Sequence, residues 1–217
     1  MTGRVAGIKN HSVPAATVPR LSRYLRKLQE MQSRGTSTVS SRQLAEAVGT
    51  NPAQIRKDLS YFGEFGIRGV GYDVASLIEE LKKCLGLDRT WNTIIVGAGK
   101  LGTALARYRA FQKQGFNLLG MFDSAAAVIG KSRGVGHVKS TDELEDFITS
   151  NRVDIAIITT PASVAQELID RVVAAGVPSV LNFAPIRAHV KEPAIVRQVD
   201  LSTELMSLSF YLNNQGC

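Results

Sequence analysis

Gly97, Gly99 and Gly102 follow a short apolar run, Thr93–Val96, and precede a segment with helical periodicity. In this spacing the first glycine permits a tight turn, the second leaves room for a phosphate against bare backbone, and the third lets the helix approach the strand. The start of a helix also attracts anions. The pattern therefore predicts that the pyrophosphate of a dinucleotide binds at Gly97, Ala98, Gly99, Lys100, Leu101 and Gly102.

An acidic residue stands where the ribose of a bound adenosine would lie. Asp123 ends a second apolar run and lies 21 residues beyond Gly102, and an acid at this distance accepts hydrogen bonds from ribose hydroxyls. Ser124 follows it instead of an arginine, which favours NAD(H) over NADP(H), although Lys131 and Arg133 are close in sequence. The alternative is that the glycines form only a tight strand-to-helix turn.

The second half of the chain alternates apolar runs with helix-like segments, and the helix after the glycines has an apolar face of Leu101, Leu105 and Tyr108. We expect further strands and helices at 135–138, 142–149, 154–160, 161–175, 177–183 and 195–199. This order predicts a Rossmann-like, doubly wound parallel sheet, which binds ligands at the carboxyl ends of its strands. Candidates there for the nicotinamide side are Thr159, Thr160, Pro161, Asn182, Phe183, Ala184 and Pro185.

The positive charge of the chain is concentrated in its first half. Residues 1–90 hold 14 Lys and Arg against 8 Asp and Glu, whereas residues 91–217 hold 12 against 11. A basic half joined to a nearly neutral half indicates a polyanion as the partner of the first. The alternative is a basic surface that serves only solubility.

Two short helices joined by a tight turn are expected in this basic half. Ser40 and Gln43 form a capping-box pattern at the start of the first, and Asn51 and Pro52 are typical first residues of the second, over 52–62. The open face of the second carries side chains that suit base edges and phosphates. This is the helix-turn-helix pattern, with an ordinary three-helix bundle as the alternative. The DNA-binding candidates are Gln54, Arg56, Lys57, Ser60 and Tyr61.

Residues 63–72 alternate apolar side chains with glycines, which predicts a small hairpin, the wing of a winged helix. Arg68 near its tip would enter a minor groove. The alternative is a glycine-rich linker. We therefore expect a winged helix-turn-helix domain over 17–88, after a disordered arm over 1–16 and before a nucleotide-binding domain over 89–199.

The chain closes with a helix expected from about 202 to 212, in a dimerisation segment of residues 200–217. Its leucines form a heptad-like stripe: Leu201, Leu205, Leu208 and Leu212. The stripe would pack either on its own domain or on a second subunit. A homodimer would also suit the first domain, because helix-turn-helix proteins usually read two half-sites.

An enzyme is the weaker interpretation. A dehydrogenase needs a substrate domain and a proton-transferring residue, yet few residues follow Phe183, and His11, His137 and His189 have no acidic partner in sequence. We therefore expect a regulator and no catalytic residues, with a small NAD-dependent oxidoreductase carrying a basic appendage as the alternative. Two cysteines without metal-ligand spacing and the lack of a long apolar run predict a cytoplasmic protein with no metal and no membrane span.

Several longer runs resemble one known family. They are Ser22–Arg26, Ile55–Gly63, Gly69–Tyr72, the glycine turn, Leu181–Pro185 and Asp200–Leu205. Together, over residues 15–213, they are similar to the Rex family of redox-sensing transcriptional repressors, and the R-K-D-L-S-Y-F-G and L-N-F-A-P runs are the specific ones. The chain departs from the family in its longer N-terminal arm, in Thr160 where a valine is frequent before Pro161, and in its short tail.

The resemblance implies a homodimer whose C-terminal helix is exchanged between subunits. It also implies that NADH releases the protein from palindromic operators of respiratory and fermentative genes, whereas NAD⁺ favours the DNA-bound form. Arg26, Tyr108 and Asp200 match a switch in which Asp200 pairs with Arg26 in one state and accepts a hydrogen bond from Tyr108 in the other. The matching positions in the recognition helix are Arg56, Lys57 and Ser60.

Overall fold

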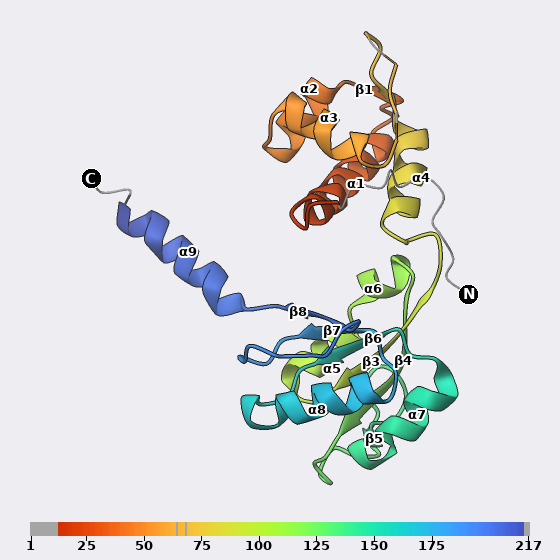
Figure 1. Cartoon of the computed structure of the whole chain (residues 1–217), viewed down its shortest axis with the longest axis vertical. Coiled ribbons are helices and arrows are strands. Elements are labelled where there is room, and N and C mark those ends of the chain that lie inside the picture. Colours follow the sequence, from red (N-terminus) through yellow and green to blue (C-terminus); the bar gives the residue numbers. More distant parts are fainter. Residues whose placement is uncertain (1–12, 64, 68, 215–217) are drawn as a thin grey trace. The chain divides into compact units, whose positions relative to one another are not determined.

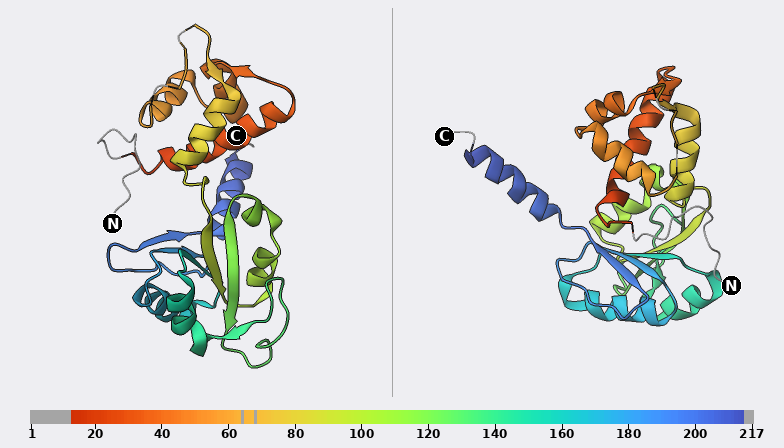
Figure 2. Two further views of the ribbon diagram at one scale, coloured as in Figure 1. Left: turned by 90° about the vertical axis from the view of Figure 1, so that its right-hand side faces the viewer. Right: turned by 45° about the horizontal axis from the view of Figure 1, so that its top comes forward.

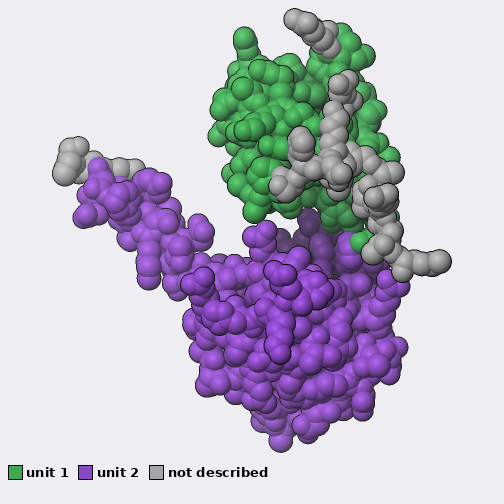
Figure 3. Space-filling model, in the orientation of Figure 1, with its two compact units in different colours: residues 1–89 green, residues 90–217 purple. Residues whose placement is uncertain are grey.

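The structure is a computed structural model that describes residues 13–63, 65–67 and 69–214. The chain divides between Arg89 and Thr90 into two compact units, which Figure 3 shows in different colours. Each unit has its own hydrophobic core. Residues 1–12 of the predicted arm lie outside the described part of the chain, and within residues 13–16 the carbonyl of Pro14 accepts a hydrogen bond from the Thr17 amide at 2.8 Å.

Unit 1 is a small helical domain (Figure 1). Its helices are α1 (Thr17–Ser33), α2 (Ser41–Val48), α3 (Pro52–Ser60) and α4 (Val74–Cys84), and its strands are β1 (Thr38–Val39) and β2 (Tyr72–Asp73). The two strands pair antiparallel, with Val39 opposite Tyr72. The core is mainly aliphatic and draws on all four helices, through fully buried side chains that include Leu21, Leu28, Leu44, Ile55, Leu77 and Leu81.

The predicted start of each helix in the helix-turn-helix is confirmed. At α2 the Ser40 hydroxyl accepts a hydrogen bond from the Gln43 amide, and the Gln43 side chain accepts one from the Ser40 amide at 2.9 Å. At α3 the Asn51 side chain accepts from the Gln54 amide at 2.8 Å, and Pro52 is the first helical residue. α3 ends at Ser60, two residues before the predicted end.

The predicted wing is smaller than a two-stranded hairpin over 63–72. Ile67 and Gly71 exchange backbone hydrogen bonds of 2.9 and 3.0 Å and close one tight turn. The strand that follows, β2, pairs with β1 and not with the other arm of the turn. Ile67 and Val70 are exposed on the turn, and Arg68 lies outside the described residues.

Unit 2 contains the predicted parallel sheet. Its strands are β3 (Trp91–Val96), β4 (Phe116–Asp123), β5 (Lys139–Ser140), β6 (Ile155–Ile158), β7 (Ser179–Asn182) and β8 (Ile195–Gln198). They lie in the order β5-β4-β3-β6-β7-β8, and every pairing is parallel. The chain reverses its winding direction between β3 and β6, and such a switch point opens a crevice beyond the strand ends.

Helices cover the two faces of the sheet (Figure 1). One face packs against α7 (Leu144–Asn151) and α8 (Ala162–Ala174), and the other packs against α5 (Lys100–Ala106) and α6 (Arg109–Lys113). Because side chains alternate along a strand, Ile94 and Val96 face α7 and α8 whereas Ile95 faces α5 and α6. A 3-10 turn, η1 (Thr141–Glu143), precedes α7.

Two local predictions in unit 2 were wrong. Residues 135–138 are not a strand, because the chain there makes only a Ser132–His137 bridge and pairs with β4 one residue later, at Lys139. The helix after the glycines stops at Ala106, since Tyr108 takes an extended backbone (φ −77°, ψ 93°) before α6. Leu101 and Tyr108, predicted on its apolar face, are 39% and 57% exposed.

The chain ends in α9 (Leu201–Asn214), which is drawn apart from the helices on the sheet in the right-hand view of Figure 2. All its residues are exposed, and its large apolar side chains are 59 to 72% exposed: Leu201, Leu205, Met206, Leu208, Phe210, Tyr211 and Leu212. Over the described ranges, none of the helices has the length and apolar character needed to cross a bilayer.

Candidate functional site

The glycine turn joins β3 to α5, and two of its glycines are required by close packing. Gly97 has φ +109°, and a Cβ there would lie 2.8 Å from the Thr159 carbonyl carbon. A Cβ at Gly102 would lie only 2.0 Å from the Gly97 carbonyl oxygen. Larger residues at these positions would push the turn away from β6 or the helix away from the turn.

Gly99 differs from the other two glycines. Its backbone is extended (φ −69°), and a Cβ added there would meet no atom within 4 Å. The packing of the protein therefore does not explain why this position lacks a side chain. The open space lies where the predicted pyrophosphate would approach the backbone. Lys100 and Leu101, which begin α5, are exposed.

Asp123 at the end of β4 locks the turn in place. One carboxylate oxygen accepts a hydrogen bond from the Ala98 amide at 2.7 Å, and the other accepts from the Ala125 amide at 2.8 Å. Each oxygen has a further lone pair, so the carboxylate keeps the capacity to accept from ribose hydroxyls. Asp123 thus both positions the glycine turn and borders the cleft beside it.

A cleft of about 480 Å³ lies beyond the carboxyl ends of β3, β4 and β6. Its predicted members are Gly97, Gly99, Asp123, Thr159, Thr160 and Pro161. Sequence reasoning missed the residues that line it farther from the glycine turn, among them Thr141, Ser163, Glu167 and Arg171. Helical periodicity identifies the exposed side of α8, but only the packing of α8 beside η1 decides which of its residues face a ligand.

Arg171 joins neighbouring elements on the side of the cleft farther from the glycine turn. Its guanidinium donates to both carboxylate oxygens of Glu145, at 2.6 and 2.9 Å, and to the Thr141 carbonyl at 2.7 Å. The hydrogen bond from Arg171 lowers the pKa of Glu145, and the same bond raises the pKa of Arg171. The pair therefore stays charged at neutral pH and ties α7 to α8.

The predicted residues after β7 do not line this cleft. Asn182 is fully buried and donates to the side chain of Gln198 at 2.8 Å and to the Ala184 carbonyl, while its own carbonyl accepts from the Ala184 amide at 2.9 Å. Phe183 packs in the apolar cluster with Ile157. Pro185 borders a separate depression.

The open face of α3 carries the cations predicted to meet DNA. Arg56, Lys57 and Ser60 are exposed, and the Arg56 guanidinium donates to the Ser41 hydroxyl of α2 at 3.0 Å. A groove of about 530 Å³ lies between this face and the turn at 65–71. Tyr61 is half-buried just beyond the end of α3.

Gln54, predicted to read bases, is held by a residue that sequence reasoning missed. Asp58 is fully buried and accepts hydrogen bonds from Gln54 (2.8 Å), Tyr24 (2.7 Å) and Arg20 (2.6 and 2.7 Å). Burial raises the pKa of its carboxyl, but the hydrogen bonds from Arg20, Tyr24 and Gln54 outweigh burial and hold that pKa below its ordinary value. The sequence signal that could have identified Asp58 was an acidic residue on the apolar side of a predicted helix.

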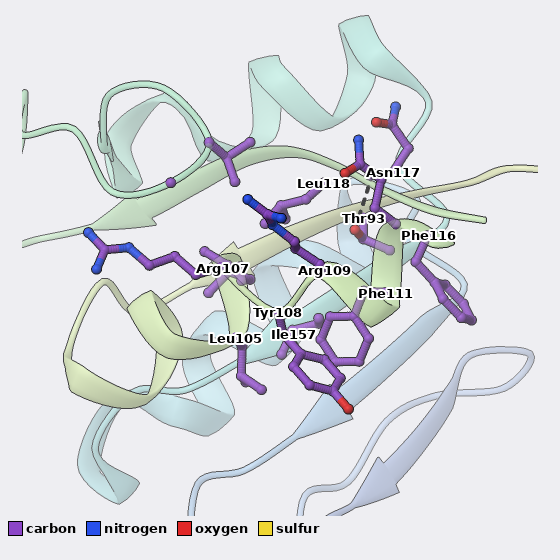
Figure 4. Close-up of a pocket in the computed structure, with 15 residues that line it drawn as sticks. Thr93, Leu105, Arg107, Tyr108, Arg109, Phe111, Phe116, Asn117, Leu118 and Ile157 are labelled. Atoms are coloured by element: carbon purple, nitrogen blue, oxygen red, sulfur yellow. Dashed lines mark hydrogen bonds between the residues drawn. The ribbon is translucent and has the colours of Figure 1, made fainter. Parts of the chain in front are cut away.

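Each of the three predicted switch residues has its own surroundings within its unit. Tyr108 lines a cavity of about 540 Å³ (Figure 4). Its ring packs edge-on against the ring of Phe111, with 5.1 Å between the two ring centroids. Asp200 caps α9, accepting from the Ser202 amide at 2.9 Å. That hydrogen bond lowers the pKa of Asp200 and keeps it anionic. Arg26 lies in unit 1 among other cations, including Arg23.

Over residues 13–63, 65–67 and 69–214, no group of three or more His, Cys, Asp or Glu side chains could hold an ion. Cys84 is half-buried in α4, and burial raises the pKa of its thiol, so it is a packed residue and not a reactive one.

A helix-turn-helix unit with a basic reading face, joined to a parallel sheet with a dinucleotide-type glycine turn, defines the class of ligand-responsive transcriptional regulators. Comparisons with known proteins agree. Residues 12–60 match the family described as "Putative DNA-binding protein N-terminus", and residues 88–186 match the one described as "CoA binding domain".

Whole-chain relatives are more specific. The redox-sensing transcriptional repressor Rex of Carboxydothermus hydrogenoformans is 47% identical over 94% of this chain and 98% of its own length. The Rex protein of Streptomyces coelicolor is 47% identical over 97% of this chain and 82% of its own length. The chain therefore belongs to the Rex family of redox-sensing transcriptional repressors, and not to the enzymes that share its nucleotide-binding fold.

Solved structures of one protein, RSP, a Rex-family repressor, resemble this chain over both units. RSP in complex with β-NAD⁺ and operator DNA has a TM-score of 0.91, with 42% identity and 95% of each chain covered. RSP in complex with β-NADH has a TM-score of 0.88, with 41% identity, covering 95% of this chain and 97% of RSP.

Proposed function

We propose that this chain is an NADH-responsive repressor that binds palindromic operators and is released from them by NADH, in the cytoplasm, where it controls respiratory and fermentative genes. The observation that carries the proposal is the open backbone at Gly99, in a cleft that borders Asp123. The residues fit NAD(H): the turn leaves space for a pyrophosphate, and Asp123 retains lone pairs for ribose hydroxyls.

The nicotinamide ring reports the redox state. The ring is neutral in NADH and positively charged in NAD⁺, so an apolar environment favours NADH because it does not compensate the charge. Ile157, Phe183 and Leu181 form such an environment on the face of β6 and β7. We assign the nicotinamide side to this region, with Thr159, Thr160, Pro161, Asn182, Ala184 and Pro185 forming or supporting its border.

Release from DNA requires that NADH favour one arrangement of the protein over another. A ligand that binds both arrangements equally shifts nothing, however tight its binding. We assign the switch to Arg26, Tyr108 and Asp200. Asp200 is anionic and exposed, and so is able to pair with a cation such as Arg26. Tyr108 is also exposed, and its hydroxyl is able to replace that cation.

A homodimer would bring these residues together. α9 exposes an apolar stripe, and no helix connects β7 to β8, so Leu181 and Phe183 are only half-buried on their face of the sheet. An exposed apolar surface of this extent is typical of an interface. We infer that α9 of each subunit packs on the other subunit, and that the two copies of α3 read two half-sites.

DNA contacts are assigned to α3 and the turn after it. Arg56, Lys57 and Ser60 are the exposed groups on α3, with Gln54 and Tyr61 at its edges. Arg68, which lies outside the described residues, completes the assignment by its place in the sequence. Arg and Gln suit base edges, whereas Lys and Ser suit phosphates.

The test is a titration of the full-length protein on a labelled operator duplex at fixed salt, followed by fluorescence anisotropy. NADH is expected to weaken operator binding, and NAD⁺ to oppose that effect. The absorbance of the reduced nicotinamide should stay constant when small carbonyl compounds are added, whereas an oxidoreductase would consume NADH. Unchanged operator affinity over the full range of NADH would contradict the proposal.

A further inference from the structure

The Gln54 side chain is held in place by a buried carboxylate. Its Nε2 donates to the Asp58 Oδ1 at 2.8 Å, across one turn of α3. Asp58 is fully buried and is itself fixed from α1, because Tyr24 donates to it at 2.7 Å and Arg20 donates to both of its oxygens. A residue on the rim of α3 is therefore anchored to a rigid group inside unit 1.

The chemistry of Asp58 decides which end of the Gln54 amide faces it. The hydrogen bonds that Asp58 accepts hold the pKa of its carboxyl below the ordinary value, so the group is ionised at neutral pH. An ionised carboxylate only accepts hydrogen bonds. Turning the amide over would place its oxygen against a carboxylate oxygen, with no hydrogen between them. The amide nitrogen of Gln54 must therefore face Asp58, and its Oε1 lies on the other side.

This orientation matters because of where Gln54 stands. It is the third residue of α3 and is half-buried, and the N-terminal residues of a recognition helix are those that contact base edges. A glutamine reads adenine by accepting from the N6 amino group and donating to N7. The amide nitrogen carries two hydrogens, so one stays on Asp58 while the other meets the base. Among the described residues, no hydrogen bond occupies the Gln54 Oε1.

We propose that Asp58 is a positioning residue for base recognition: it accepts one amide hydrogen of Gln54 and so presents the other hydrogen and the amide oxygen to an adenine in the major groove. The inference rests on the proposed function of α3 as the DNA-reading helix. A freely rotating glutamine would also donate to guanine, which has acceptors at both N7 and O6. With the amide fixed by Asp58, its oxygen would oppose the guanine O6 instead.

The test measures discrimination between bases and not affinity alone. The full-length wild-type protein first selects a palindromic duplex from a pool of random sequences, and the base pairs of that duplex are then substituted one at a time. Fluorescence anisotropy at fixed salt gives the ratio of affinities for the selected and the substituted duplex, in which any loss of folded protein cancels. Gln54→Ala should lose roughly tenfold discrimination at one A·T pair, which identifies the base that Gln54 reads.

Asp58→Asn should lose discrimination at the same pair, chiefly that of adenine over guanine. A neutral amide donates as well as accepts, so it allows either orientation of Gln54. Combining the two substitutions should add no further loss. Tyr24→Phe is the matched control, because it removes a different hydrogen bond to the same carboxylate. It should melt at a lower temperature than wild type but keep the discrimination.

A second measurement needs no variant of Asp58. In NMR spectra of the wild-type protein, the side-chain amide of Gln54, identified by its loss in Gln54→Ala, should exchange with solvent more slowly than that of the exposed Gln29. Equal exchange of the two amides would overturn the inference. So would full discrimination in Asp58→Asn, additive losses in the double variant, an equal loss in Tyr24→Phe, or unchanged ratios at every base pair in Gln54→Ala. A wild-type protein that selects no duplex would instead refute the proposed function.

Discussion

Arg20 and Asp58 form a bidentate ion pair that ties α1 to α3. The Arg20 Nε and Nη2 atoms lie 2.6 and 2.7 Å from the two carboxylate oxygens of Asp58. Tyr24 and Gln54 donate to the same carboxylate. Because Asp58 is fully buried and each of its oxygens accepts two close hydrogen bonds, its charge is compensated without water.

Removing this charge should destabilise unit 1. Asp58→Asn leaves the Arg20 guanidinium beside a neutral amide whose own N–H groups face donors. We expect a loss of about 2–4 kcal/mol in unfolding free energy, somewhat less than for a fully buried pair because the Arg20 side chain is 23% exposed. Urea unfolding measures the loss. The exposed Asp146→Asn is the control, and an equal effect of both variants would argue against a special role for Asp58.

The same pair predicts an acid dependence. The pKa of Asp58 is lower in the folded protein than its ordinary value, so its stabilisation is complete above the unfolded-state pKa of about 3.9 and is lost as pH falls through the folded-state pKa. Other carboxyls, such as Glu145, contribute equally in wild type and Asp58→Asn. The difference in stability between these two proteins should therefore shrink on acidification. A constant difference down to about pH 2 would refute this prediction.

Substitutions at two glycines of the turn should distinguish an effect on folding from an effect on ligand binding. Gly102→Ala places a Cβ 2.0 Å from the Gly97 carbonyl oxygen, and we expect it to lower stability by about 1–3 kcal/mol or more. Gly99→Ala meets no protein atom within 4 Å and has a backbone that alanine adopts readily. It should melt as wild type does but bind NADH poorly, because its methyl group occupies the space assigned to the pyrophosphate. Calorimetric melting and NADH titration measure both, and normal NADH binding by Gly99→Ala would count against the site.

Lys57 should contribute to DNA affinity without sequence preference. It is exposed on α3 near Arg56, where a lysine suits a phosphate. Lys57→Ala should weaken binding to operator and scrambled duplexes alike and lower the slope of log affinity against log salt by about 1 per site. NADH affinity should not change. An unaltered salt dependence would remove Lys57 from the interface.

The apolar stripe of α9 should determine the oligomeric state. Leu205 and Leu208 are 68% and 59% exposed, and in the proposed dimer they become buried. Leu205→Glu with Leu208→Glu should yield monomers by analytical ultracentrifugation, because a carboxylate is costly to bury in an apolar interface. Ser202→Glu, on the same helix, is the matched control and should remain dimeric. A wild-type monomer at micromolar concentration would contradict the dimer.

Local signals in the sequence determined most elements of this protein. The starts of α2 and α3 follow from Ser40, Gln43, Asn51 and Pro52, whose side chains act on backbone groups no more than three residues away. The alternation of strands and helices likewise determined the parallel sheet, because consecutive parallel strands need a crossover between them. The glycine turn could likewise be located from its local spacing of glycines, before its surroundings were known.

Long-range pairing decided the elements that were missed. β2 pairs with β1, where Val39 lies opposite Tyr72, 33 residues later, and nothing near Tyr72 signals that partner. The strand expected at 135–138 became Lys139–Ser140 because β4 offers its pairing edge there. Asp58, on the inner side of α3, became a buried hub only because Arg20 and Tyr24 approach it from α1.

The threonines at the end of β6 show most clearly what the sequence determined and what only the tertiary structure decided. The sequence by itself identified Thr159 and Thr160 as equivalent candidates at the carboxyl end of a strand. Only the tertiary structure distinguished them, because successive side chains of an extended chain point in different directions and meet different neighbours. The Thr159 hydroxyl reaches the Gly97 carbonyl, whereas the Thr160 hydroxyl has no hydrogen-bond partner among the described residues.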